Sequence, residues 1–278
     1  MSPIPAIAAV AAMLFAGTAQ ADEAIRAANN QESLSVGLGH LHTSDQAQPT
    51  GGSVVLNEGS GYELQLGYDT TRTRTLFGMP GFYTKLQVLL GGAQMNYAGT
   101  SHDPSTGAAG PNNGPYNLGS ELVQVRAGRT WEFGPGQRLA LTPYAGLRQQ
   151  AWLRDSSTYA RFTGYNHFGA DVGVLGQAAL TRTWVLGLDA GLGRTFGGLQ
   201  FDGHNLVWPP KAAIGDFSLY VDHRTDADWH QRLSIRQDVV RYPEPPSADN
   251  IYEPRRRAGL SVGLEFGTEL DLYKGLFY

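Results

Sequence analysis

The end of the chain, Arg257 to Tyr278, constrains its fold more than any other stretch. Every second residue is apolar over most of its length: Ala258, Leu260, Val262, Leu264, Phe266, Leu270, Leu272 and Leu276. The positions between them begin with Arg257, Gly259, Ser261, Gly263 and Glu265. A period of two predicts a β-strand with one apolar and one polar face, since a helix would need apolar residues at i, i+3, i+4 and i+7.

The start of the chain has a different pattern. Ile4 to Phe15 is a short, alanine-rich apolar run, and Ala19 and Ala21 fit the small-residue rule for signal peptidase. The run is too short to cross a bilayer, which takes about 20 apolar residues. We predict that residues 1–21 are a cleaved secretory signal and that residues 22–278 form one domain. A buried alanine-rich helix is the alternative.

The composition narrows the class of exported protein. The chain has no cysteine, so no disulfide can hold a small secreted core together. Charged residues make up 17% of the chain, against about 25% in ordinary soluble proteins, and 36 of the 278 residues are glycine. With a formal net charge of −4 and no basic stripe interleaved with aromatics, no nucleic-acid partner is expected.

Further segments with the same alternation follow one another along the chain. In Gly61 to Asp69, for example, Tyr62, Leu64, Leu66 and Tyr68 alternate with polar or glycine positions. With the C-terminal stretch they number about ten: Ser33 to His42, Gly61 to Asp69, Gly81 to Gly92, Glu121 to Trp131, Leu139 to Leu153, His167 to Leu180, Trp184 to Thr195, Ile214 to Asp222 and His230 to Tyr242. Ten is an even number, as single-chain bacterial barrels require.

An alternating strand that ends the chain on an aromatic residue, here Tyr278, resembles the C-terminal strand of Gram-negative outer-membrane β-barrels, and the small porin-like and opacity-like barrels in particular. The resemblance implies an all-β, closed, antiparallel up-and-down transmembrane barrel in the cell outer membrane. It also implies contact with outer-membrane lipid and lipopolysaccharide, and recognition of the last strand by the barrel assembly machinery. Twelve strands would need more alternating segments, and eight are possible if Ile214 to Tyr242 lies outside the membrane.

The links between the segments alternate in length. Those near 71–80, 133–138, 181–183 and 224–229 are short, whereas those near 43–58, 99–117, 154–166, 199–213 and 243–254 are long. Short periplasmic turns and long extracellular loops are the rule in this class, so both termini are expected in the periplasm. The long loops would meet an extracellular ligand that the sequence does not identify.

The polar face of each segment is expected to line the lumen. It carries both signs of charge: Glu63, Asp69, Lys85, Gln87, Gln124, Arg126, Arg148, Gln150, Asp171, Asp189, Asp216, Arg236, Asp238 and Glu265. These groups either pair and fill the interior, because small barrels have room for little beyond side chains, or line a thin polar channel. Glu265 is expected near Arg126, Arg148 or Arg236.

Aromatic residues that favour the two membrane interfaces form a predicted girdle. Its members are Tyr62, Tyr68, Phe82, Trp131, Trp184 and Tyr278. The run Arg255 to Arg257 stands at a strand entrance, where solvated or lipopolysaccharide-facing cations are expected.

Candidates for enzyme chemistry are sparse. His40 and His42 lie near Ser44 and Asp45, and Asp226, Asp228 and His230 share one strand parity. The second group resembles the carboxylate and imidazole pairing of omptin proteases, but the loop pattern places it at a periplasmic turn, the wrong end for such a site. No group has zinc or EF-hand spacing. We therefore predict no catalytic residues, no metal and no cofactor, with an outer-membrane protease or lipid A acyl hydrolase as the enzyme alternative.

Overall fold

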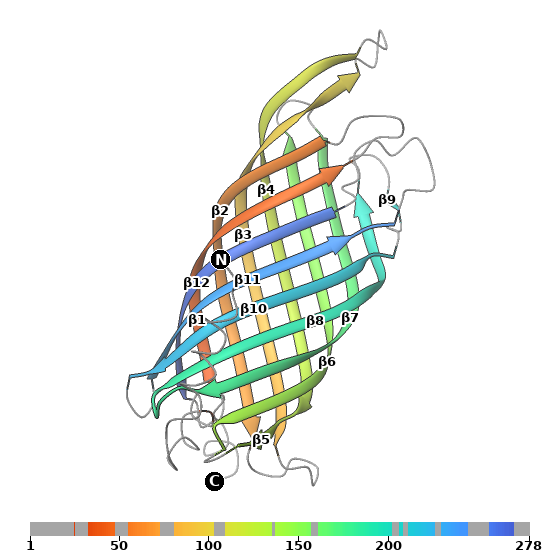
Figure 1. Ribbon diagram of the computed structural model, residues 1–278. Coiled ribbons are helices and arrows are strands. Elements are labelled where there is room, and N and C mark those ends of the chain that lie inside the picture. The colour runs from red at the N-terminus through yellow and green to blue at the C-terminus, as the bar shows by residue number, and fades with distance from the viewer. Residues whose placement is uncertain are drawn as a thin grey trace, which may run out of the picture.

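The computed structural model describes residue 25 and residues 33–47, 55–72, 81–102, 109–134, 137–156, 161–201, 206–207, 211–225, 229–243 and 256–269. Twelve antiparallel strands form one sheet (Figure 1). They are β1 (Ser33–Ala47), β2 (Val55–Arg72), β3 (Phe82–His102), β4 (Ala109–Arg129), β5 (Trp131–Phe133), β6 (Leu139–Ser156), β7 (Arg161–Ala179), β8 (Trp184–Phe201), β9 (Leu206–Val207), β10 (Ala213–Arg224), β11 (Trp229–Arg241) and β12 (Arg256–Glu269). None of the described residues forms a helix long and apolar enough to span a membrane.

Ten of these strands close into a barrel, and the two shortest, β5 and β9, only extend its rims. Strands β10, β11, β12, β1, β2, β3, β4, β6, β7 and β8 are neighbours in that order, and β10 pairs with β8 to complete the circle. The pair β10 and β11, on which the eight-strand alternative depended, is therefore part of the wall. Closure gives every strand a partner on both sides, which a bilayer without water requires of any sheet that crosses it.

The first and last strands pair as expected. Strand β12 lies antiparallel to β1 from Ser33 opposite Glu269 to Gln46 opposite Arg256. The predicted strand ran from Arg257 to Tyr278, whereas β12 ends at Glu269. Residues 270–278, including Tyr278, lie outside the described residues, as do residues 1–21 of the predicted signal peptide.

The alternation seen in the sequence sorts the side chains between the two faces of the wall. Leu38, Val172 and Leu192 are 68%, 64% and 74% exposed on the outside. Their strand neighbours Gly37, Asp171 and Gly191 face inward. A wall one residue thick thus gives an apolar surface outside and a polar interior, as in transmembrane barrels.

Inward-facing glycines explain why the chain is rich in this residue. A Cβ atom on Gly187 would clash with the ring of Tyr220, and one on Gly173 would clash with the Tyr144 hydroxyl. Both tyrosines are buried in the lumen, at 6% and 5% exposure. Glycine on one strand therefore leaves the volume that a large side chain from another strand fills.

One irregularity changes which residues of β8 point into the lumen near the end of the strand. The pairing of β7 with β8 shifts between Phe168 and Gly169, so that Phe196 of β8 is left without a partner position. This is a β-bulge, in which one strand carries an extra residue. Before the bulge Thr195 points inward, and beyond it Gly198 does so instead of Gly197.

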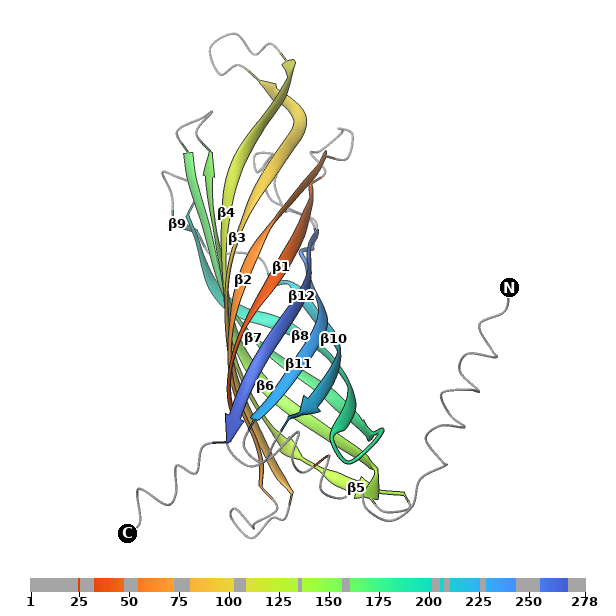
Figure 2. The same cartoon turned by 90° about the vertical axis from the view of Figure 1, so that its left-hand side faces the viewer.

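The strands extend further at one end of the barrel than the sequence predicted. The segment 99–117 was expected to be a loop, but β3 and β4 pair continuously as far as His102 opposite Ala109. This hairpin rises beyond the other strands in both views (Figures 1 and 2). The segment was mistaken for a loop because its Gly, Pro and Asn residues are typical of turns.

The opposite end carries the short turns. In the turn 181–183, the Thr181 Oγ1 accepts hydrogen bonds from the backbone N–H groups of Thr183 and Trp184. Gly81 adopts φ 73°, in the left-handed region that favours glycine, and its carbonyl accepts a hydrogen bond from Thr130 N–H at 2.8 Å. These tight turns mark the periplasmic end by the rule for outer-membrane barrels.

Replacing Gly187 with alanine is expected to destabilise the barrel by about 1–3 kcal/mol, because the new methyl group must displace the Tyr220 ring. Urea unfolding of the refolded protein in detergent micelles, followed by tryptophan fluorescence, measures the change. Gly92→Ala is the matched control, since a Cβ there meets no atom within 4 Å. Equal stability of the two variants would contradict this packing account.

Because the chain has no cysteine, single cysteines can report its orientation. A cysteine at Gly110, in the extended β3–β4 hairpin, should react with a membrane-impermeant maleimide on intact cells. A cysteine at Thr181, in the β7–β8 turn, should react only after the outer membrane is permeabilised. The reverse pattern would invert the orientation.

Candidate functional site in the barrel lumen

Arg126 of β4 lies at the centre of a network of ion pairs in the lumen. Its guanidinium group binds Asp189 of β8 at 2.7 Å, Asp216 of β10 at 2.6 Å and Asp171 of β7 at 3.2 Å. The arginine residue is only 2% exposed and also lies 4.3 Å from the centroid of the Tyr144 ring. One side chain thus ties the wall at β4 to three strands on another part of the circle.

Neighbouring side chains complete this arrangement, the Arg126 network. Gln124 donates to Asp171 at 2.9 Å, and the Tyr144 hydroxyl donates to Asp189 at 2.6 Å. Arg148 of β6 binds the other oxygen of Asp216 at 3.3 Å. Each carboxylate therefore has at least two partners, which offsets much of the cost of burying it.

A second network lies between β2 and β11. Arg236 binds Glu63 at 2.6 Å and lies 3.9 Å from Asp238. Gln65 donates to Glu63 at 2.9 Å, and Gln150 donates to Asp238 at 3.5 Å. Within the described residues, the Nε and Nη1 atoms of Arg236 are buried without a hydrogen-bond partner.

The periplasmic half of the lumen has its own ion cluster. Asp222 binds His230 at 2.9 Å and Arg232 at 3.0 Å, and Arg232 lies over the Tyr220 ring at 4.4 Å. Near the same end, Ile25 is 1% exposed in an apolar cluster whose other members are Ala140, Ala179 and Val185. A residue from before the first strand therefore packs against the inner wall, which no pattern in the sequence indicated.

The extracellular half is filled by aromatic rings. Trp152 stacks on Tyr165 at 5.7 Å between centroids, and the Tyr242 hydroxyl is 2.9 Å from His167 Nε2. Arg257 points inward and lies 4.4 Å from the Trp152 centroid, so the predicted run of solvated arginines is split between the two faces. The inward position of Trp152 follows from its parity with Arg148 and Gln150, a signal that the sequence did contain.

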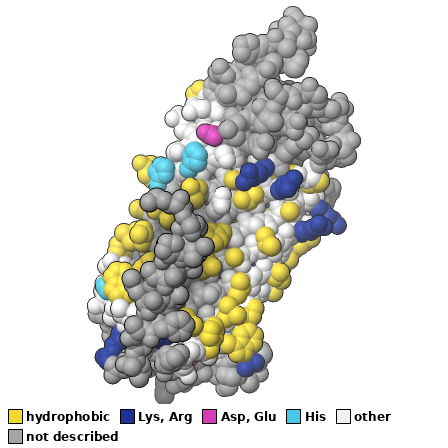
Figure 3. Space-filling model, viewed as in Figure 1, with side chains coloured by type: hydrophobic (Ala, Val, Ile, Leu, Met, Phe, Trp, Pro, Cys, Tyr) yellow, Lys and Arg dark blue, Asp and Glu magenta, His cyan; other side chains and the backbone are white. Residues whose placement is uncertain are grey.

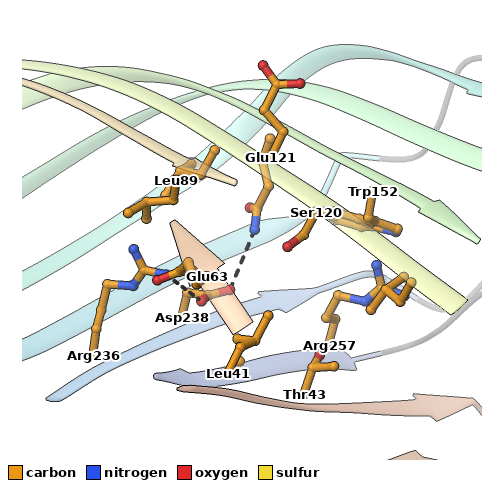
Figure 4. A pocket seen from close by; sticks show the side chains of 14 residues that line it. Leu41, Thr43, Glu63, Leu89, Ser120, Glu121, Trp152, Arg236, Asp238 and Arg257 are labelled. Carbon is orange, nitrogen blue, oxygen red and sulfur yellow. Dashed lines mark hydrogen bonds and ion pairs between the residues drawn. The ribbon is translucent and has the colours of Figure 1, made fainter. Parts of the chain in front are cut away.

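Two small cavities remain between these groups. One, of about 40 Å³, is lined by Glu63, Trp152, Arg236, Asp238 and Arg257 among others (Figure 4). The other, of about 30 Å³, lies by the Arg126 network. Both are bordered by Leu122, Arg236 and Asp238. These volumes are those open to the centre of a water-sized sphere, and one water molecule needs roughly 10–15 Å³ of such volume. Each cavity therefore has room for only a few waters.

The structure places most of the predicted lumen residues on the inner face. Buried or half-buried there are Glu63, Lys85, Gln87, Gln124, Arg126, Arg148, Gln150, Asp171, Asp189, Asp216, Arg236, Asp238 and Glu265. The side chain of Asp69 lies outside the described part. The expected partner of Glu265 was wrong: it accepts a hydrogen bond from Ser35 at 3.4 Å, and Arg126, Arg148 and Arg236 bind other carboxylates.

The predicted girdle residues face outward where they are described. Tyr62, Trp131 and Trp184 are 76%, 46% and 41% exposed, and Tyr68 and Phe82 are half-buried. Tyr62 contacts His40 edge to face at 6.1 Å, near the extracellular end. Trp184 stacks on His223 at 4.1 Å beside a periplasmic turn. The aromatics thus lie toward both ends of the apolar surface.

The histidines of the enzyme alternative do not share a site. His42 faces outward, and its Nδ1 lies 3.1 Å from Ser60 Oγ, whereas His230 faces the lumen near the opposite end. Asp226 and Asp228 lie outside the described residues. Among the residues that the structure describes, no three His, Asp or Glu side chains are grouped so that they could hold a metal ion.

No model of a known protein family matches the chain, and no curated protein matches it. Among solved structures, the outer membrane protease OmpT from Escherichia coli is similar over 86% of this chain and 97% of its own, with 9% identity and a TM-score of 0.48. An outer membrane channel from Pseudomonas putida F1 matches over 86% and 96%, with 13% identity and a TM-score of 0.38. Ail of Yersinia pestis matches over 86% and 99%, with 9% identity and a TM-score of 0.31.

Replacing Arg126 with methionine is expected to lower the free energy of unfolding by about 3–5 kcal/mol, because it leaves buried carboxylates without their common partner. Urea titration of the refolded barrel in micelles measures the loss. Arg129→Met is the matched control, since Arg129 lies on the outer face of the same strand. A loss no larger than the control's would show that the network does not hold the barrel together.

The class of the protein follows from the wall itself. The sheet has no open edge, since β8 pairs with β10 and β12 pairs with β1. Large apolar side chains cover its outside, and paired charges fill its inside. A surface of this kind needs apolar surroundings, and a closed antiparallel barrel is the form in which bacterial β-proteins cross the outer membrane. The chain is an integral outer-membrane β-barrel protein.

Proposed function

We propose that this protein is a plugged barrel with a structural and surface-interaction role, exerted through its long extracellular connections, and that it has no enzymatic role. The observation that carries the proposal is the Arg126 network, in which a single guanidinium group bridges β4 to β7, β8 and β10. A side chain held across the lumen by three carboxylates leaves little space for a solute.

The pairing of charges supports a permanent plug. Arg126 and Arg148 share Asp216, and Arg236 binds Glu63 on the other side of the lumen. Opening a path would separate these pairs in a poorly hydrated interior, where removing one partner of a buried ion pair costs about 3–5 kcal/mol. Spontaneous separation of all three ion pairs, Arg126–Asp216, Arg148–Asp216 and Arg236–Glu63, would therefore be rare.

Contacts toward both ends support the same conclusion. Ile25 packs on the inner wall toward the periplasm, and Trp152, Tyr165, His167 and Tyr242 occupy the interior toward the outside. Apolar and aromatic fillings of this kind exclude water and ions. The interaction surface is then the exterior, where the β3–β4 hairpin extends beyond the rest of the barrel (Figure 2).

A narrow channel for small solutes is the second candidate, and the two cavities favour it. Leu122, Arg236 and Asp238 line both cavities, so the two lie next to each other. Movement of the Arg236 side chain away from Asp238 would join them into a longer water-filled space. Arg236 and Asp238 would then be the selectivity residues of a thin polar path.

Single-channel recording separates the two candidates. The refolded protein in a planar bilayer is expected to show no stable open state. A porin with an open channel, recorded in the same bilayer, establishes that the assay detects an open barrel. A stable, ion-selective open state of the unmodified protein would replace the plugged barrel with the channel.

A further inference from the structure

Four cations gather on the outer face of the barrel near its extracellular end. Arg194 of β8, Arg241 of β11, Arg256 of β12 and Lys211, just before β10, are all exposed. Figure 3 shows Lys and Arg side chains grouped beside the upper ends of these strands, next to the yellow apolar surface of the wall. We call these four residues the cation row.

The strand register places these residues in line. Arg241 lies directly opposite Arg256, and Ala213 lies opposite both Arg241 and Arg194. Lys211 precedes Ala213 by two residues and so points to the same face. The row crosses four adjacent strands, and three strand spacings make it about 14 Å wide.

Among the residues that the structure describes, no acidic side chain faces the cation row. The acidic residues of these four strands whose side chains are described, Asp189, Asp216, Asp222, Asp238 and Glu265, all face the lumen. None of the four cations makes an ion pair within the described residues. Like charges directly opposite each other across a strand pair are destabilising, so an anion bound beside the Arg241–Arg256 pair would stabilise it.

Apolar neighbours show where the cation row lies relative to the lipid-facing surface. Leu192, 74% exposed, and Phe196, 61% exposed, lie on either side of Arg194 along the outer face of β8. Leu260, 44% exposed, follows Arg256 on β12. The cations are thus set into the edge of the lipid-facing surface rather than raised above it in free water. That edge is where the phosphate groups of a membrane lipid lie.

We propose that the cation row binds the phosphate groups of lipid A, the phosphorylated glycolipid of the outer leaflet. Lipid A carries phosphates at the two ends of a disaccharide, which suits a row of cations spread over four strands. Arginine guanidinium groups bind phosphate through two parallel hydrogen bonds. The acyl chains would then lie along the apolar wall below Arg194 and Arg256. The inference needs only a barrel in the outer membrane and does not depend on whether the lumen is plugged.

Native mass spectrometry of the detergent-solubilised barrel with added bisphosphorylated lipid A tests the proposal. The variant Arg241→Gln/Arg256→Gln should bind about twenty-five-fold more weakly than the unmodified protein, because each cation near an anionic lipid contributes about fivefold. Arg129→Gln/Arg182→Gln removes two exposed cations near the periplasmic end and should bind like the unmodified protein. Equal binding by the two double variants would overturn the proposal.

Two further arms identify the bound group. Fully dephosphorylated lipid A and inorganic phosphate should each bind far more weakly than bisphosphorylated lipid A. Undiminished binding of the dephosphorylated lipid would mean that the wall, and not the row, holds it. Binding of inorganic phosphate as tight as that of lipid A would make the row a site for free anions. Either result overturns the proposal.

Thermal unfolding in detergent, with and without lipid A, distinguishes the loss of lipid binding from a folding defect. Without lipid A, Arg241→Gln/Arg256→Gln should unfold at or above the temperature of the unmodified protein, because the like-charge repulsion is gone. With lipid A, the unmodified protein should gain stability and the variant should gain little. A variant that is already less stable without lipid A would contradict the repulsion on which the proposal rests.

Discussion

The requirement that every backbone N–H and C=O find a partner in a medium without water governs this structure. A single open edge among the ten strands would leave a row of such groups in lipid. The pairing of β12 with β1 removes the two edges that the chain order would otherwise leave. The outer apolar face, the crowded lumen and the confinement of irregular backbone to the rims all follow from this closure.

Closure of the sheet encloses a narrow space that the inward-facing side chains must fill. Half of the strand residues must face a narrow space, and the chain fills it with pairs of opposite charge and with tyrosines that lie against glycine. The first kind of filling is seen where Arg126 binds three carboxylates. The second is seen where the Tyr220 ring lies against Gly187. The abundance of glycine is therefore a property of the lumen, whereas the share of charged residues is low because the outer face is mostly apolar.

The alternation of residues predicted most of the wall, because facing in a strand depends only on the parity of nearby residues. Glu63, Arg126 and Asp216 could be assigned to the lumen in this way, and β12 could be paired with β1. The partners across the lumen could not, since Arg126 and Asp216 are far apart in the chain and meet only through the tilt and stagger of the closed sheet. The Ser35 contact of Glu265 depends on the exact register of β1 against β12, and Ile25 lies before the first strand, so alternation predicted neither contact.

The bulge at Phe196 bears on how such a barrel can change during evolution. Inserting one residue into a regular strand would turn every later side chain from lumen to lipid, which would place charges in the membrane. In β8 the unpaired Phe196 accommodates one extra residue close to the rim, where only a few residues follow it. Single-residue length changes are therefore expected to survive in relatives of this barrel near strand ends, whereas changes in the middle of a strand should come in pairs.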